Sequence, residues 1–213
     1  MDKTIQINGL FKKKLFVLAP FIKEPWREFT LTEIKKLTKK KSHHYVFEAL
    51  KGFIKLNLIK EKKKGNTNIY TINVENQEVH YVVLIEHLIK EQRKDIPYKN
   101  ITKITCRIKS PFYSLIIGGS YAEGRQKPTS DLDIAIIIPD SENKNQYEAA
   151  LREGELLIPE IHGYIFTKKE FYEMLVNKEF NYGKELARKH ILCHGAEPYY
   201  EILFEAMRNG FNG

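Results

Sequence analysis

The sequence predicts an α/β (α+β) chain of two domains, each combining helices with strands. In the first half, helical hydrophobic spacing gives way to two extended, lysine-rich segments, and in the second half apolar strands alternate with helical segments. Charge also differs between the halves: residues 1–93 hold 19 Lys and Arg against 10 Asp and Glu, and residues 94–213 hold 16 against 17. This asymmetry indicates a polyanion-binding module joined to a module with another task, although a general enrichment in lysine is an alternative.

Composition excludes several classes of protein. Among the 213 residues, no apolar run approaches the roughly 20 residues that would span a bilayer, so no membrane segment is expected. The start, "MDKTIQINGLFKKK", lacks an apolar stretch followed by a small-residue cleavage site, so no secretion signal is expected. Cys106 and Cys193 have neither the number nor the spacing of a zinc site or a disulfide framework. We therefore expect a cytoplasmic protein.

Three helices are predicted in the first half. The stretch "FKKKLFVLAPFIKEP" has apolar residues at helical spacing, and Pro20 is expected to kink or end the helix. Thr30 and Glu33 form a T-x-x-E capping box that opens a second, short helix. A third helix is predicted to start near Ser42, with one buried face formed by Val46, Leu50, Phe53 and Ile54.

A basic hairpin follows, with β-prone segments at residues 58–62 and 68–74 around a Lys-Gly-Asn turn. Three helices and a hairpin in this order, over residues 10–74, resemble the winged helix-turn-helix domain. The resemblance implies that the third helix enters the major groove of duplex DNA and that the hairpin lies along phosphates. A protein or RNA interface and a merely solvated basic face are the alternatives. The candidate DNA-binding residues are Lys40, Lys41, His43, His44, Lys51, Lys62, Lys63 and Lys64.

Residues 75–93 are predicted to form a long amphipathic helix that links the halves or forms a homodimer surface. Residues 94–111 carry two prolines around a second, shorter amphipathic stretch. The expected division is therefore residues 1–74 as the winged helix-turn-helix domain, 75–110 as linker helices and 111–213 as the second domain.

The most informative stretch is "GGSYAEGRQKPTSDLDIAIIIPD", residues 118–140. "FYSLIIGG" predicts a buried strand that ends in a tight glycine turn, and "DLDIAIIIP" predicts a second strand. Strand alternation puts Asp131 and Asp133 on one face, where two carboxylates would raise each other's pKa unless a cation compensates. Oxygen ligands of this kind favour Mg²⁺ or Mn²⁺, which also bind nucleotide phosphates.

The glycine turn suits an anion. Without side chains at Gly118 and Gly119, backbone amides can approach a phosphate, and the Ser120 hydroxyl adds one more donor. Gly119, Ser120, Asp131 and Asp133 together resemble the pattern of the nucleotidyltransferase superfamily, which contains DNA polymerase beta and the minimal nucleotidyltransferases. The resemblance runs from about residue 112 to 200. It implies a small mixed sheet flanked by helices, Mg²⁺ on the two aspartates and triphosphate at the glycine turn.

Two departures from the family pattern affect the site. Minimal members often carry Arg where this chain has Glu123, and Arg125 follows the next glycine as a candidate nucleotide ligand. The superfamily's third carboxylate usually comes from the strand that here reads "PEIHGYIF", in which Glu160 and His162 share a face. Because Mg²⁺ prefers oxygen to nitrogen, Glu160 is the favoured third catalytic residue. The alternatives are that His162 fills this position or that neither residue does.

The resemblance thus implies an enzyme that moves a nucleoside monophosphate from an NTP, with ATP favoured, to an acceptor that the sequence does not identify. The alternative is a DNA-binding transcriptional regulator whose nucleotidyltransferase domain is a sensor or is catalytically degenerate.

Overall fold

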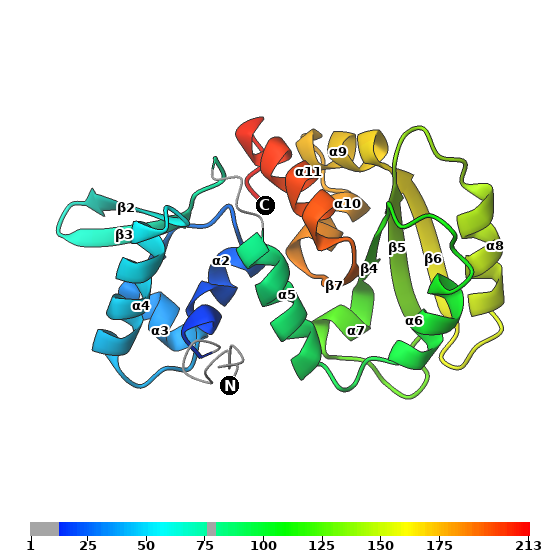
Figure 1. Cartoon of the computed structure of the whole chain (residues 1–213), viewed down its shortest axis with the longest axis horizontal. Coiled ribbons are helices and arrows are strands. Elements are labelled where there is room, and N and C mark those ends of the chain that lie inside the picture. Colours follow the sequence, from blue (N-terminus) through cyan, green and yellow to red (C-terminus); the bar gives the residue numbers. More distant parts are fainter. Residues whose placement is uncertain (1–12, 76–79) are drawn as a thin grey trace, which may run out of the picture. The chain divides into compact units, whose positions relative to one another are not determined.

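A computed structural model describes residues 13–75 and 80–213 of the chain (Figure 1). They divide into two compact units with a boundary between Tyr81 and Val82, and Asn212 is assigned to the first unit and Gly213 to the second. Among the described residues, no helix combines the length and the apolar character needed to cross a membrane.

In the first unit, a short 3-10 turn, η1 (Phe16–Leu18), runs into α2 (Ala19–Lys23). Pro20 lies in the first turn of α2, where a missing backbone N–H is tolerated. The described residues of the predicted first helix, 13–23, are therefore helical throughout, and the 3-10 turn lies just before Pro20, which was expected to kink or end the helix. This stretch buries side chains that include Val17, Phe21 and Ile22.

The next two helices begin where their capping residues predict. The Glu33 amide donates to the Thr30 hydroxyl at 3.2 Å and the Thr30 amide donates to the Glu33 carboxylate at 2.8 Å, which confirms the capping box at the start of α3 (Leu31–Leu37). Helix α4 (His43–Lys55) starts after Ser42, whose hydroxyl accepts from the Tyr45 amide.

The predicted hairpin is formed by β2 (Ile59–Lys64) and β3 (Thr67–Ile72), which pair in antiparallel fashion. A third strand that the sequence analysis did not predict, β1 (Phe29–Thr30), pairs with β3 and gives the order β1-β3-β2. Two residues are too few to show a period of two, so the sequence carries no signal for this strand.

The second unit is built on a four-stranded mixed sheet with the order β6-β5-β4-β7. Its strands are β4 (Ser114–Ile117), β5 (Leu132–Ile138), β6 (Ile161–Thr167) and β7 (Ile191–His194). Strand β4 is antiparallel to both β5 and β7, whereas β5 and β6 are parallel. A small mixed sheet flanked by helices agrees with the predicted fold class of this half.

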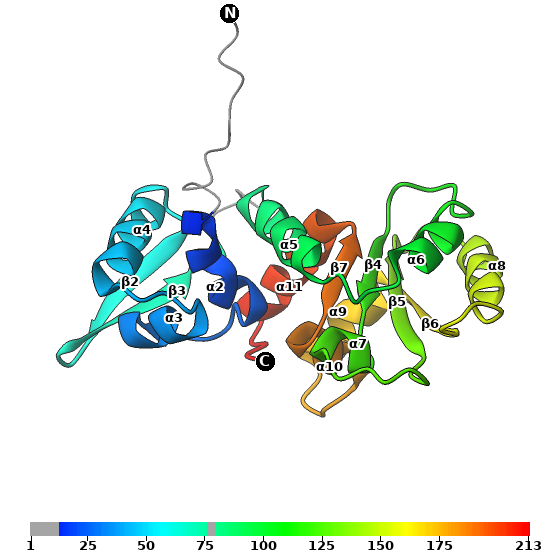
Figure 2. The same ribbon diagram turned by 90° about the horizontal axis from the view of Figure 1, so that it is seen from below.

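Seven helices accompany the sheet in the described part of this half: α5 (His80–Gln92), α6 (Tyr98–Thr105), α7 (Gly119–Glu123), α8 (Asn145–Gly154), α9 (Lys168–Val176), α10 (Tyr182–Arg188) and α11 (Ala196–Arg208). Helices α6 and α8 lie on one side of the sheet, and α9 and α10 lie on the other (Figures 1 and 2). A second capping box, between Thr167 and Glu170, opens α9 as predicted.

The predicted amphipathic helix of residues 75–93 corresponds to α5, and residues 76–79 lie outside the described residues. Residues 82–110, expected to be a linker, pack within the same compact unit as the four-stranded sheet. The apolar positions of α6 and its flanks explain this packing, because they are buried in one core with β4 and β5. These positions are Ile96, Ile101, Ile104 and Ile108.

The two faces of β5 differ in character. Leu132, Ile134 and Ile136 alternate toward the core shared with α6 and α8. The intervening positions face α9 and α10, and the first of them is Asp133. The sheet therefore holds a carboxylate at one end of an otherwise apolar strand.

Candidate active site

Three strand ends meet at one edge of the second sheet. Because β4 is antiparallel to β5 and β6 is parallel to it, the end of β4 lies beside the starts of β5 and β6. Backbone hydrogen bonds join these ends: the Gly118 amide donates to the Asp133 carbonyl at 3.0 Å, and the Leu132 amide donates to the Glu160 carbonyl at 2.8 Å. The predicted glycine turn and both predicted acidic segments are therefore brought together.

Gly119 is in close contact with the Asp133 carboxylate. Its φ is +56°, and a Cβ added there would lie 2.0 Å from Asp133 Oδ2. Both the left-handed backbone and the lack of space exclude any other residue without rearrangement. The chain thus holds a carboxylate oxygen directly against the turn that is the candidate phosphate site.

Asp133 is partly buried whereas Asp131 is half exposed. Burial raises the pKa of Asp133 above its usual value, the nearby Asp131 carboxylate raises it further, and His162 lowers it. Net destabilisation of an ionised carboxylate favours a cation at this position, since a bound cation would offset the unfavourable charge.

His162 lies between two carboxylates. Its Nε2 is 3.2 Å from Glu160 Oε1, and its Nδ1 is 3.9 Å from Asp131 Oδ2. In the parallel register, His162 is the partner of Asp133. Glu160 precedes the first residue of β6 and is exposed. The structure thus brings both candidates for the third catalytic group to the edge that holds the two aspartates.

Arg125, a candidate nucleotide ligand, forms an ion pair with Glu123. Lys189 of the segment after α10 pairs with the same carboxylate. The Glu123 side chain is largely buried, and the Arg125 side chain is mostly exposed. To contact a phosphate, the Arg125 guanidinium would have to give up at least part of its ion pair with Glu123. Lys189 would still neutralise the Glu123 carboxylate.

The acidic side chains at this edge are the candidate ligands for a divalent cation. Within residues 13–75 and 80–213, no three His, Cys, Asp or Glu side chains are arranged to hold a metal ion. Mg²⁺, however, is commonly bound by one or two carboxylates, with waters and substrate phosphates completing the octahedron. Asp131 and Asp133, with a side-chain-free turn beside them, fit that pattern.

Arg93, Asp95 and Gln126 form a hydrogen-bonded clamp at the end of α7 that the sequence did not predict. The guanidinium of Arg93 donates to both oxygens of Asp95, at 2.9 and 2.7 Å, and to the carbonyls of Tyr121 and Ala122. The Gln126 side chain donates to Asp95 at 2.9 Å. These contacts tie the last turn of the helix that carries Gly119 and Ser120 to the loop before α6, over more than 25 residues of sequence.

Tyr182 of α10 also escaped the sequence analysis. A Cβ added at Gly118 would lie 3.4 Å from its hydroxyl oxygen, so the hydroxyl reaches the glycine turn. That oxygen is buried and has no hydrogen-bond partner in the described part of the chain. Burial raises the pKa of Tyr182, and the Asp133 carboxylate raises it further. No local pattern could have linked residue 182 to residue 118.

The candidate DNA-binding residues all belong to the first unit. Lys41, His43 and His44 are exposed at the start of α4. Several of the lysines have partners: Lys51 lies 3.3 Å from Glu48, Lys40 lies over the Tyr45 ring, and both Lys62 and Lys64 pair with Glu28. No acidic partner is seen for Lys63 among the described residues of the hairpin.

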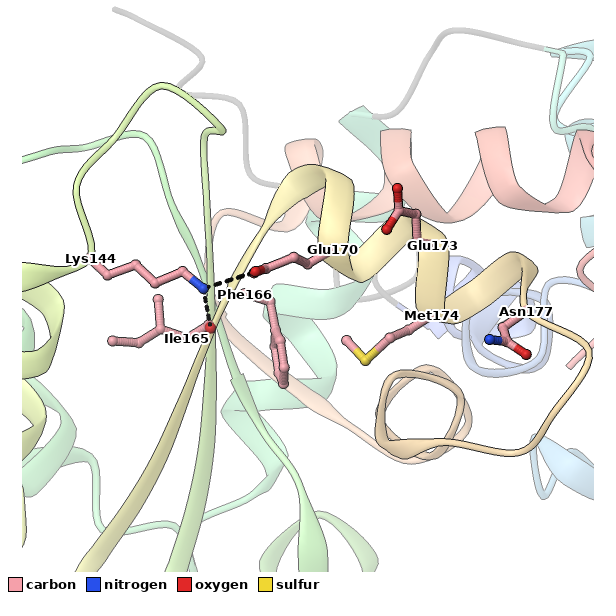
Figure 3. A pocket seen from close by; sticks show the side chains of 7 residues that line it. All are labelled: Lys144, Ile165, Phe166, Glu170, Glu173, Met174 and Asn177. Atoms are coloured by element: carbon pink, nitrogen blue, oxygen red, sulfur yellow. Dashed lines mark hydrogen bonds and ion pairs between the residues drawn. The ribbon is translucent and has the colours of Figure 1, made fainter.

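A pocket of about 520 Å³ lies at the other end of β6, between that strand and α9 (Figure 3). Lys144 closes one side of it by donating to the Glu170 carboxylate and to the Ile165 carbonyl. The Phe166 side chain extends from β6 toward Met174 of α9. The pocket therefore lies beyond the candidate active site along the same strand.

Comparison with known protein families adds one finding. Residues 98–186 match the family model described as nucleotidyltransferase domain. The matched segment includes β4, the glycine turn, β5, β6 and the first five residues of α10, and so contains every candidate catalytic and nucleotide-binding residue. The match supports transfer of nucleoside monophosphates as the general activity of this part of the chain. No curated protein and no solved structure matches the chain.

Proposed function

We propose that the chain is a divalent-cation-dependent nucleotidyltransferase that moves a nucleoside monophosphate from an NTP, with ATP favoured, to a hydroxyl-bearing acceptor. The observation that carries the proposal is the position of Asp133. Its carboxylate is held against the Gly119 turn, at the edge where the ends of three strands bring Asp131 and Glu160 beside it.

Each group has a role in this reaction. The backbone amide of Gly119 and the Ser120 hydroxyl donate to phosphate oxygens. The Gly118 amide, predicted as a further donor, is already bonded to the Asp133 carbonyl, so Gly118 contributes only the absence of a side chain. Asp131 and Asp133 hold Mg²⁺ or Mn²⁺, which when bound neutralises phosphate charge and aligns the reacting oxygens. The acceptor oxygen attacks the α-phosphorus, the bond from that phosphorus to the bridging oxygen breaks, and pyrophosphate leaves.

Glu160 accepts the proton of the attacking hydroxyl. His162, hydrogen-bonded to Glu160 at 3.2 Å, orients that carboxylate. Glu160→Gln should therefore lower transfer by about 10²- to 10⁴-fold while ATP affinity stays within a few fold, and His162→Ala should have a much smaller effect. Glu153→Gln, an exposed acid on α8, is the matched control. A larger loss of transfer in His162→Ala than in Glu160→Gln would assign the role of proton acceptor to His162.

The test of the whole proposal uses ATP labelled on its α-phosphate, with Mg²⁺ and cell extract as the source of acceptor. The wild-type chain should transfer label. The double variant Asp131→Asn, Asp133→Asn should retain its fold but lose both transfer and Mg²⁺-dependent ATP binding, measured by calorimetry. Unchanged metal-dependent affinity in the double variant would refute the assignment of the metal site.

A second candidate function is favoured by one observation, the imidazole of His162 in register with Asp133. In that case the domain binds a nucleotide without transferring it, and the first unit acts as a DNA-binding winged helix in a transcriptional regulator. Binding of ATP without any transfer of label, together with salt-dependent binding of duplex DNA, would favour this function.

A homodimer through α5 is a further proposal, for which sedimentation is the direct measurement.

A further inference from the structure

An aromatic cluster continues the candidate active site along β6. Strand alternation places Tyr164 and Phe166 on the same face as His162. The register pairs Tyr164 with Ala135, two residues beyond Asp133. The rings of Tyr164 and Phe166 are nearly parallel, with an interplanar angle of 5° and centroids 6.4 Å apart. Aromatic surface therefore begins directly beside the carboxylates.

Strand geometry gives the scale. Neighbouring strands are about 4.8 Å apart and two residues advance about 6.7 Å, so the Cα atoms of Tyr164 and Asp133 are roughly 8 Å apart. The nucleoside part of an NTP whose phosphates lie at Asp133 can reach across this distance. The Tyr164 ring is also accessible to a ligand, since the residue is 49% exposed.

Tyr182 connects the aromatic cluster to the glycine turn. Its ring centroid is 4.8 Å from that of Tyr164, while its hydroxyl reaches Gly118. Among residues 13–75 and 80–213 that buried hydroxyl has no hydrogen-bond partner, which is costly unless a ligand supplies one. A ligand that contacts both the ring of Tyr164 and the glycine turn is the molecule that carries the phosphates, which favours the nucleotide over the acceptor.

We propose that Tyr164 stacks on the base of the bound nucleoside triphosphate and that the Tyr182 hydroxyl hydrogen-bonds to the same nucleotide. This inference rests on the proposed function, because phosphates at the glycine turn bring the base to β6. Stacking on an aromatic ring accepts any base, so this contact contributes affinity and little discrimination between bases.

The experiment compares MgATP with magnesium tripolyphosphate, which has the phosphates but no base, by calorimetry on the full chain. Tyr164→Leu should weaken ATP binding about tenfold and leave tripolyphosphate binding unchanged, since only the stacked base is lost. Tyr164→Trp should retain ATP binding and show quenching of the new indole by ATP alone. Tyr182→Phe should weaken ATP binding several fold. Phe112→Leu, an exposed aromatic residue before β4, is the matched control and should change neither affinity.

The outcomes are distinct. If Tyr164→Leu weakens ATP and tripolyphosphate binding equally, or leaves ATP affinity unchanged, the proposed base contact is refuted. Unchanged ATP affinity with reduced transfer would assign the ring to the acceptor instead. If the wild-type chain binds tripolyphosphate as tightly as ATP, the base contact is refuted while the proposed function stands. If it binds neither ligand, both fail. Thermal unfolding of each variant, with Tyr164→Trp as the conservative replacement, separates a loss of contact from a loss of fold.

Discussion

The ion pair between Arg93 and Asp95 in the clamp on α7 should contribute to the free energy of unfolding in a pH-dependent way. Arg93 donates to both oxygens of Asp95 and thereby lowers the Asp95 pKa from 3.8 to about 2. One pKa unit corresponds to about 1.36 kcal/mol, so this change sets an upper bound of about 2.4 kcal/mol on the contribution of the ionised carboxylate. The Asp95 side chain is 36% exposed, and solvent screening reduces the expected contribution to about 1 kcal/mol.

Asp95→Asn should therefore lower the free energy of unfolding by about 1 kcal/mol at pH 7. Because the folded-state pKa is depressed, the contribution is fully present above the unfolded pKa near 4 and is lost as the pH falls toward 2. The difference between wild type and Asp95→Asn should accordingly shrink between pH 4 and pH 2.

Urea titrations followed by hydrogen-exchange mass spectrometry on peptides of β4 and β5 measure this difference in the second unit. The fluorescence of Trp26, the single tryptophan, reports the first unit and should not change. Glu153→Gln removes an exposed ion pair with Arg107 and should cost less than about 0.5 kcal/mol. A difference between Asp95→Asn and wild type that stays constant down to pH 2, or is absent at pH 7, would refute the reasoning.

Three further outcomes are expected. Gly119→Ala should destabilise the second unit by about 3 kcal/mol in urea titrations. Gly124→Ala, with a similar φ but only an ordinary van der Waals contact to Arg93 at 3.9 Å, should cost about 1 kcal/mol. Asp133→Asn should raise the melting temperature of the metal-free protein by about 2 °C, since it removes a desolvated charge, and a lower melting temperature would contradict this. Glu28→Gln should release Lys62 and Lys64 from their ion pairs and steepen the slope of log K for duplex DNA against log salt by about one to two units. Lys63→Ala should flatten that slope by about one unit. Unchanged slopes in both variants would show that the hairpin does not bind the DNA.

Local sequence signals predicted much of the fold. Both capping boxes form because each needs only residues three apart, and Ser42 caps α4 for the same reason. Strands β4 and β5 were recognisable because β4 is a short apolar run that ends at glycines and β5 is an apolar run that follows Asp131. The two-residue β1 had no such signal, since its place in the sheet depends on a partner about 40 residues away.

The candidate site was predictable only in part, for the same reason. The spacing of Gly119 and Asp133 identified them, but their contact depends on the antiparallel pairing of β4 with β5. Arg93 lies 28 residues from the carbonyl of Tyr121 to which it donates, and Tyr182 lies still further from Gly118. Arg125 was a candidate nucleotide ligand only through the resemblance, in place of an Arg that minimal members often carry where this chain has Glu123, and its ion pair with Glu123 could not be predicted from that pattern.

The topology also places the residues that tolerate little substitution and the residues whose substitution leaves the core intact on different strands. Asp133 is on β5, between two partner strands, and a bulkier residue at Gly119 would displace its carboxylate, so this part of the site tolerates little change. His162 and Tyr164 instead belong to β6, an edge strand, Glu160 directly precedes it, and all three are exposed. Substitutions there leave the apolar core between the sheet and α8 intact. We therefore infer that contacts to the nucleoside and the acceptor depend on residues at β6, whereas the capacity to bind phosphates and a cation depends on the pairing of β4 with β5.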